Sequence, residues 1–119
     1  YLSLRDNDFT QFPEPLLRIP NLAHLDLSMN RISSLPEDIS KMVNLRSLSL
    51  KGNRLVEIPR GLTQLGNLEF LDLSCNIVKS IPPFFGDLKG LKKLEISYNE
   101  LRTEEEARWE QTFPLSSTP

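Results

Sequence analysis

A repeat of 23 residues organises this chain. Asparagine recurs with that step at Asn7, Asn30, Asn53, Asn76 and Asn99, and leucine or isoleucine stands three and five residues before each copy. Proline stands six residues after each of the first four asparagines. The unit therefore reads Leu-x-x-Leu-x-Leu-x-x-Asn-x-Leu-x-x-Leu-Pro. A repeat of this length predicts a solenoid, in which each unit is one coil and neighbouring coils stack.

The residues before each asparagine alternate between apolar and polar. In the third unit Leu48 and Leu50 are separated by Ser49 and preceded by Ser47. A period of two predicts a short strand that turns its leucines to one side and its polar residues to the other. A coiled coil is excluded, because leucine spacings of three and two do not sustain a heptad and a proline in each unit would break a long helix.

The asparagine stands where the chain must turn away from the strand. Buried backbone groups lose their ladder partners at such a turn, and a short amide side chain can satisfy them. The five asparagines are therefore interpreted as a structural ladder. After the turn, Pro59 suits the first turn of a short helical segment, and Gly66-Asn67 suits a left-handed end before the next strand. Because every unit repeats this path, all strands are expected to run parallel.

Stacking supplies the core that one unit lacks. The few apolar side chains of a single unit cannot offset the conformational entropy lost on ordering its backbone. Strands of neighbouring units lie about 4.8 Å apart, whereas the helical side is bulkier. The stack should therefore bend into an arc, which predicts an α/β solenoid with a concave parallel sheet and short helical or 3-10 segments on its convex side.

Charge and composition narrow the classes of partner. The 119 residues include 14 Lys+Arg and 16 Asp+Glu, which gives a net charge of −2. Near-neutrality supplies no field to hold nucleic acid, and no basic block would lie on an anionic membrane. No apolar run approaches the roughly 18 residues of a membrane helix. We expect neither nucleic-acid binding nor membrane insertion.

Cysteine usage favours a cytoplasmic location. Cys75 stands alone and cannot form an internal disulfide, and none of the eight asparagines begins a glycosylation acceptor. The chain opens at Tyr1 within a strand, which indicates a fragment and predicts an open first edge. Such an edge could support weak self-association of two copies.

These motifs resemble the leucine-rich repeat family. The 23-residue unit with its Leu/Ile-Pro ending is similar to the intracellular class of Ras-suppressor and Scribble-like proteins, and the resemblance covers residues 1–102. It implies a curved solenoid, a concave sheet that binds protein partners, and commonly a role as a scaffold or regulator in signalling. It does not identify the partner, because many functions share such folds.

Three segments are expected along the chain. The array should cover residues 1–102 in five units, the first of them incomplete. Capping-box spacing from Thr103, with Trp109 and Phe113 four residues apart, predicts a capping helix over 103–113, although the start of a flexible linker is an alternative. Residues 114–119 read as a flexible tail.

The non-leucine strand positions define a mixed concave surface. Phe70, Cys75, Ile77 and Tyr98 are expected to supply exposed apolar contacts, and Asp26, Asp72 and Glu95 form an acidic stripe that could steer a basic partner. The alternative is a solvated face whose charges pair with Arg5, Lys51 and Lys93. The predicted protein-binding residues are His24, Asp26, Met29, Phe70, Asp72, Cys75, Lys93, Glu95 and Tyr98.

The sequence offers no convincing catalytic or metal site. His24, Asp26 and Ser28 alternate on one strand, and a spacing of about 6.6 Å is too long for a nucleophile and its base. Asp72 and Glu95 could approach on neighbouring strands, but an open sheet provides no closed pocket that would tune a carboxylate pair. Cys75 lies too far from His24 to form a pair. We expect no catalytic residues, metal or cofactor.

The favoured function is accordingly a non-enzymatic protein-protein interaction module, a scaffold or adaptor that binds a protein on its concave face. The alternative is a regulatory or substrate-recruiting repeat domain of a larger enzyme, such as a kinase, phosphatase or ubiquitin ligase. A purely structural role in a large assembly is a third possibility.

Overall fold

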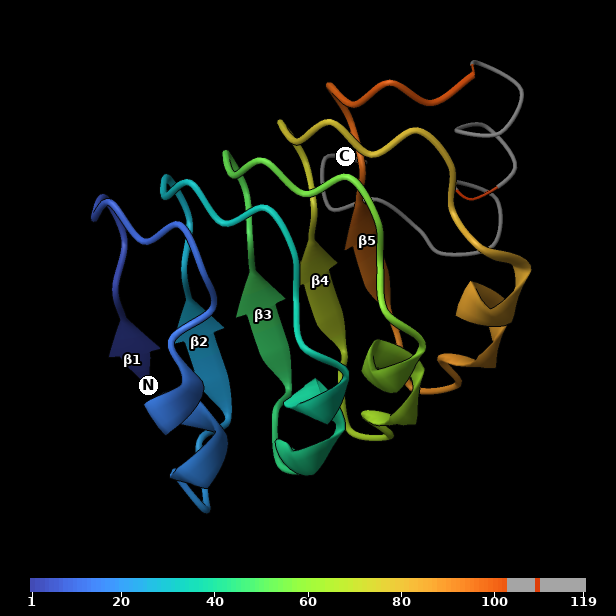
Figure 1. The fold of residues 1–119 in the computed structure, drawn as a ribbon. Coiled ribbons are helices and arrows are strands. Elements are labelled where there is room, and N and C mark those ends of the chain that lie inside the picture. Colours follow the sequence, from blue (N-terminus) through green and yellow to red (C-terminus); the bar gives the residue numbers. More distant parts are fainter. Residues whose placement is uncertain (103–108, 110–119) are drawn as a thin grey trace.

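Five short strands alternate with 3-10 segments in the computed structural model, which describes residues 1–102 and 109 (Figure 1). The strands are β1 (Leu2–Ser3), β2 (His24–Asp26), β3 (Ser47–Ser49), β4 (Phe70–Asp72) and β5 (Lys93–Glu95). The 3-10 segments are η1 (Glu14–Arg18), η2 (Glu37–Lys41), η3 (Arg60–Gln64) and η4 (Pro83–Asp87). Each of the first four repeats thus contributes one strand and one convex segment, and the fifth contributes β5.

The strands form one open sheet in the order β1-β2-β3-β4-β5, and every pair is parallel. The register joins residues that are 23 apart, so His24 pairs with Ser47, which in turn pairs with Phe70. In Figure 1 the 3-10 segments lie on one side of this sheet and leave its other face uncovered. The parallel solenoid predicted from the repeat is confirmed.

The core lies between the sheet and the convex segments. Leu25, Leu48, Leu71 and Leu94 point inward from the strands and are almost completely buried. Ile39, Leu62 and Phe85 meet them from η2, η3 and η4, with no exposed surface. Since each layer packs between the layers before and after it, the apolar core runs without a break along the stack.

The predicted asparagine ladder is present and links consecutive repeats. Asn53 Nδ2 donates to the carbonyl oxygens of Leu50 in its own repeat and Leu27 in the preceding one, both at 3.0 Å. Its Oδ1 accepts from the backbone N–H of Ile32 at 3.0 Å. Equivalent bonds recur at Asn30, Asn76 and Asn99. One side chain therefore satisfies backbone groups of two repeats at the turn.

A second row of amides lies on the convex side and corrects one expectation. Asn44 Nδ2 donates to the carbonyl oxygen of Pro20 at 2.8 Å, and Asn67 Nδ2 donates to that of Val43 at 3.0 Å. Gly66 and Asn67 do not have positive φ angles, so the predicted left-handed end at this point is wrong. The asparagine at this position contributes a side-chain hydrogen bond to the previous repeat and not a left-handed backbone conformation.

The left-handed residue of each repeat lies directly before the ladder asparagine. Asp6, Met29, Cys75 and Tyr98 have φ angles between 57° and 59°, and Gly52 has 72°. This conformation turns the chain out of the strand and costs about 1–2 kcal/mol for a residue with a side chain. The ladder amide offsets that cost, because it bonds the backbone groups that the turn releases. Gly52 was the only sequence signal for this position.

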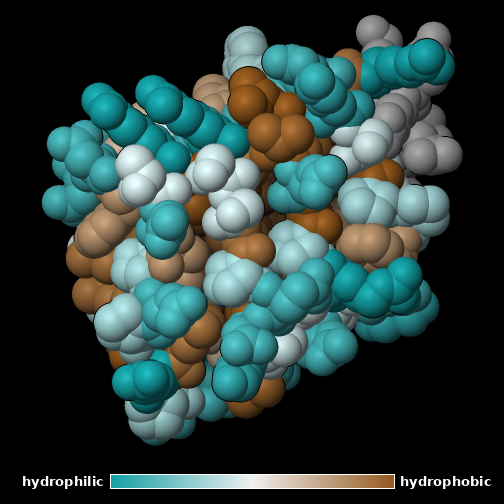
Figure 2. Space-filling view, in the orientation of Figure 1, coloured by the Kyte–Doolittle hydropathy of each residue, from teal (hydrophilic) through white to brown (hydrophobic). Residues whose placement is uncertain are grey.

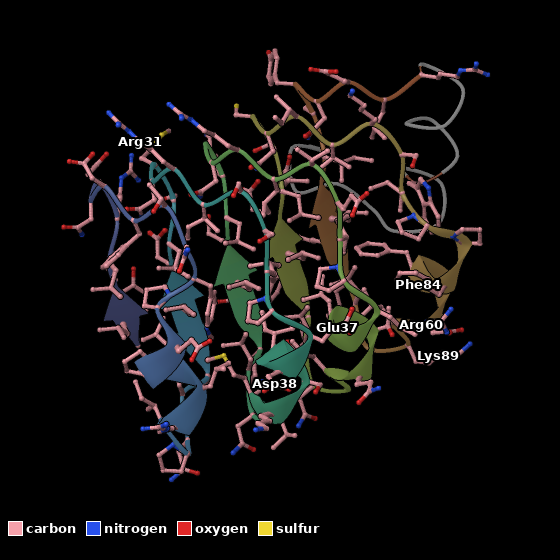
Figure 3. All side chains as sticks on the ribbon, in the orientation of Figure 1. Arg31, Glu37, Asp38, Arg60, Phe84 and Lys89 are labelled. Atoms are coloured by element: carbon pink, nitrogen blue, oxygen red, sulfur yellow. The ribbon has the colours of Figure 1, made fainter. Side chains whose placement is uncertain are left out.

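The convex segments are also joined from repeat to repeat. Each follows a proline that occupies its N-cap, at Pro13, Pro36, Pro59 and Pro82. At η3 the Glu37 carboxylate accepts from the backbone N–H groups of Arg60 and Gly61, at 3.2 and 2.8 Å. Figure 3 shows Glu37 and Arg60 close together on this side. The carboxylate of one repeat therefore caps the helical segment of the next.

The C-terminal predictions lie mostly outside the described residues. Residues 103–108 and 110–119 contain nearly all of the predicted capping helix and the whole predicted tail. Trp109 is described, is buried, and meets Phe85 edge-on with ring centroids 5.7 Å apart. The convex segment η4 of the fourth repeat thus has an aromatic contact with a residue beyond 102.

Removal of a ladder amide should be costly. We expect Asn53→Ala to lower the free energy of unfolding by about 3 kcal/mol, because buried carbonyl and N–H groups lose their partners. Urea unfolding followed by far-ultraviolet circular dichroism measures this loss. The matched control Asn67→Ala removes one exposed bond and should cost about 1 kcal/mol. Equal losses would contradict the role assigned to the ladder.

A pair of glycines tests the packing of the convex segments. A Cβ at Gly61 would collide with the backbone carbonyl oxygen of Glu37, whereas a Cβ at Gly66 meets nothing within 4 Å. Gly61→Ala should therefore lower the free energy of unfolding by about 2 kcal/mol. Gly66→Ala should change it by no more than about 0.5 kcal/mol. Similar thermal unfolding of both variants would show that η2 and η3 are not packed this closely.

Candidate protein-binding face

Six of the nine predicted binding residues lie on strands and share the face left uncovered by the convex segments. They alternate with the buried leucines, which forces them outward. We call this surface the concave face, and its strand positions in β2–β5 are His24, Asp26, Ser47, Ser49, Phe70, Asp72, Lys93 and Glu95. Phe70 keeps 38% of its surface exposed on this face.

The other three predicted residues lie elsewhere. Met29, Cys75 and Tyr98 occupy the left-handed positions, three residues beyond the ends of β2, β4 and β5. Phe70, in contrast, begins β4. The predicted apolar contacts are therefore divided between the two ends of the strands. Tyr98 is 82% exposed at the carboxyl end, and its ring is available there.

Two of the acidic residues also have a structural task. Asp26 Oδ1 accepts from the backbone N–H of Ser28 at 2.9 Å and from its hydroxyl at 2.6 Å. Asp72 and Ser74 repeat this arrangement with the same distances. Both carboxylates are half-buried and held in one orientation. The sequence signal was the tripeptide Asp-Leu-Ser, which occurs at both sites, two repeats apart.

These bonds also settle the arrangement of His24, Asp26 and Ser28. The Ser28 hydroxyl donates to Asp26, while His24 Nδ1 shares a hydrogen bond of 2.8 Å with Ser47 Oγ on β3. The three side chains therefore do not form a nucleophile, base and acid relay. No group of three or more His, Cys, Asp or Glu side chains that could hold a metal gathers within the described part of the chain.

The middle of the concave face is hollowed. A depression of about 290 Å³ lies over β3 and β4. Its polar and aromatic lining residues are Tyr1, Asp26, Ser47, Ser49, Phe70, Asp72, Lys93 and Glu95. Three carboxylates and one ammonium group line it, so the hollow carries a net charge of −2. The shortness of the two serines creates the space, because larger side chains stand on the strands either side.

The acidic residues of the concave face are not neutralised within the described residues. Asp26, Asp72 and Glu95 form no salt bridge there. Arg5, one of the basic residues expected to pair with them, contacts Asp6 instead, at 3.2 Å. Lys93 Nζ instead lies 5.7 Å from the centre of the Phe70 ring, which is a cation–π contact. The alternative of a face whose charges pair with Arg5, Lys51 and Lys93 is therefore not supported.

On the convex side, several charged side chains already have partners. Arg60 places its guanidinium 4.7 Å from the centre of the Phe84 ring, and Figure 3 shows the two side chains together. Asp38 pairs with Lys41 at 3.5 Å. Figure 2 shows mostly hydrophilic side chains over this side, with hydrophobic surface visible between them. Arg60 and Asp38 thus already have partners, which the concave acids lack within the described residues.

A three-residue ion network runs along the edge of the sheet where the strands begin. Arg46, Glu69 and Lys92 directly precede β3, β4 and β5. The Glu69 carboxylate contacts Arg46 at 3.0 Å and Lys92 at 3.8 Å. The hydrogen bond from Arg46 holds the pKa of Glu69 below its usual value, and the charge of Lys92 adds to this effect. The network bridges three repeats at the surface.

None of the helices in residues 1–102 and 109 is long and apolar enough to cross a bilayer. Within the same residues the repeated strand, asparagine turn and 3-10 segment define a repeat solenoid with an open parallel sheet.

Comparison with known proteins names the class more narrowly. A family model described as a leucine-rich repeat region matches residues 1–108. The chain belongs to the leucine-rich repeat family. The comparison with curated proteins gave no match.

Two solved structures share the fold. A leucine-rich repeat protein of Leptospira interrogans is 36% identical, with a TM-score of 0.88 over 96% of this chain and 29% of its own. An internalin from Listeria monocytogenes is 21% identical, with a TM-score of 0.74 over 89% of this chain and 30% of its own. The chain therefore spans less than a third of the length of either protein.

The ion network predicts a measurable titration. Glu69 should titrate below an ordinary glutamate, and Arg46→Gln should raise its pKa toward the usual value. Because the folded pKa is lowered, the stabilising effect of the network is present above the unfolded pKa and is lost as pH falls through the lowered one. Carboxyl carbon shifts in NMR measure this. Arg54→Gln, which changes an exposed arginine outside the network, should leave the Glu69 titration unchanged.

Proposed function

We propose that this chain is a non-enzymatic protein-interaction module that binds a protein partner through its concave face. Leucine-rich repeat proteins typically serve as such modules. The observation that carries the proposal is the exposed Phe70 in a hollow that three carboxylates also line, none of which forms a salt bridge within the described residues. An aromatic ring surrounded by charges is the usual composition of an interface hot spot.

The arrangement of the face supports a binding role over a catalytic one. Its side chains stand on rigid neighbouring strands, so a partner meets a preformed surface and little entropy is lost on binding. The hollow is shallow and open, and such a site does not exclude water from a reacting group. Its acidic character favours a partner with complementary basic groups.

We further place the protein in the cytoplasm, as a scaffold or adaptor in signalling. The free thiol of Cys75 is partly exposed and suits a reducing compartment. This placement is independent of the concave-face proposal and would be tested by imaging a tagged chain in its own cells.

Capture of partners with two matched variants tests the binding face. Phe70→Ala with Glu95→Lys changes the concave face, and neither side chain makes a hydrogen bond in the described residues. Val43→Ala with Asp38→Lys makes the same change of charge on the convex side, where both residues are exposed. After circular dichroism has shown that both variants are folded, each is used to capture proteins from lysate of the source cells. We expect a partner that binds the native chain and the convex variant but not the concave variant, and the reverse pattern would refute the proposal.

A further inference from the structure

The hollow on the concave face has the form of a slot that runs along β3. Ser47 and Ser49 form its floor, since their side chains are short. Across the register, Phe70 flanks Ser47, while Asp26 and Asp72 flank Ser49 from the two sides. We call these five residues the β3 slot. It combines an aromatic wall at one end with two carboxylates at the other.

The two carboxylates are set for a ligand between them. Asp26 and Asp72 lie two strands apart, which corresponds to about 10 Å between their backbones. In each, Oδ1 is held by a serine turn, at 2.6 Å from the hydroxyl. Within the described residues, Oδ2 of neither carboxylate accepts a hydrogen bond. The serine turns therefore fix the orientation of both groups and leave one oxygen of each available.

The charge of the surroundings selects a cation. The lining of the hollow carries a net charge of −2, and none of its carboxylates is in a salt bridge within the described residues. Lys93 already places its ammonium group 5.7 Å from the centre of the Phe70 ring, which shows that this ring can take a cation. Lys93 stands on β5, however, and β3 lies on the other side of β4. The side of Phe70 that borders Ser47 remains open to a second group.

We infer that the β3 slot receives an arginine side chain of the protein partner. The guanidinium would lie between Asp26 and Asp72, and the stem of the side chain would pack against Phe70. Arginine fits better than lysine, because its planar group offers five donors in a fork that can bond two carboxylates and also stacks on aromatic rings. This inference rests on the proposed function, since it names the partner chemistry that the concave face would recognise.

A titration with defined peptides tests the slot without knowledge of the partner. The probe is a blocked tripeptide with a central arginine between glycines, and the controls carry lysine or the neutral isostere citrulline at that position. Backbone amide shifts are followed by NMR at low ionic strength, where surface charges are least screened. The arginine peptide should shift the amides of Ser47, Ser49 and Asp72, the lysine peptide should shift them less, and the citrulline peptide should leave them unchanged.

Charge-deleting variants then locate the binding groups. In Asp26→Asn with Asp72→Asn each side chain keeps an oxygen that can accept from its serine, so the turns can be retained. The double variant should weaken arginine-peptide binding at least about fivefold, because two ion pairs are lost. Asp38→Asn on the convex side should leave the affinity unchanged. Should the double variant fail to fold, Glu95→Gln removes one charge of the hollow without touching a turn and should weaken binding about twofold.

The inference is overturned if no slot amide shifts, if the citrulline peptide binds as well as the arginine peptide, or if the folded charge-deleting variants bind unchanged. Those results would not refute the proposed function. A partner lost specifically from the Phe70→Ala and Glu95→Lys variant would still establish concave-face binding, with recognition by another chemistry. The opposite result is also informative. If the partner binds the concave variant normally while the arginine peptide still binds the β3 slot, the arginine site is supported and the concave-face proposal fails for that partner.

Discussion

The hydrogen bonds of the ladder asparagines, of which Asn30, Asn53 and Asn76 are buried, are the constraint on which the structure depends. At the end of each strand the backbone adopts a left-handed conformation, and its freed groups would otherwise be buried without partners. The amide of Asn53 bonds the backbone of its own repeat and of the one before it. The turn therefore forms properly only when a neighbouring repeat is present, which couples local geometry to stacking.

This coupling separates stability from recognition. The inward leucines, the ladder amides and the convex contacts hold the stack together. The outward side chains of the strands are therefore not needed to build the core. Among the described residues of the concave side, Asp26 and Asp72 bond the serines that follow them, and His24 bonds Ser47 on the neighbouring strand. The parallel register then brings residues from different repeats side by side, so the concave face is composed across repeats and not within one.

The sequence predicted the strands, the ladder and which strand residues point away from the core, because each of these follows from the period and from alternation. The sequence was less informative where one residue type can serve either through its backbone conformation or through the hydrogen bonds of its side chain. Asparagine was expected to make a left-handed turn at Asn67, yet it reaches to the preceding repeat instead. Met29, Cys75 and Tyr98 were predicted to bind a partner on the concave face, and the structure places them at the left-handed turn beyond the strands, a conformation to which only Gly52 pointed.

The sequence by itself determined the architecture of this protein, since a 23-residue repeat of leucine and asparagine can bury its apolar side only by stacking. It also determined which residues face outward from the strands. Only the tertiary structure decided which of these act together. Phe70 and Tyr98 are separated along the strands, whereas Ser47 and Ser49 open a hollow between larger neighbours. The physical reason is that a pocket and an ion pair depend on side-chain volume and distance across strands, which no pattern along a single chain contains.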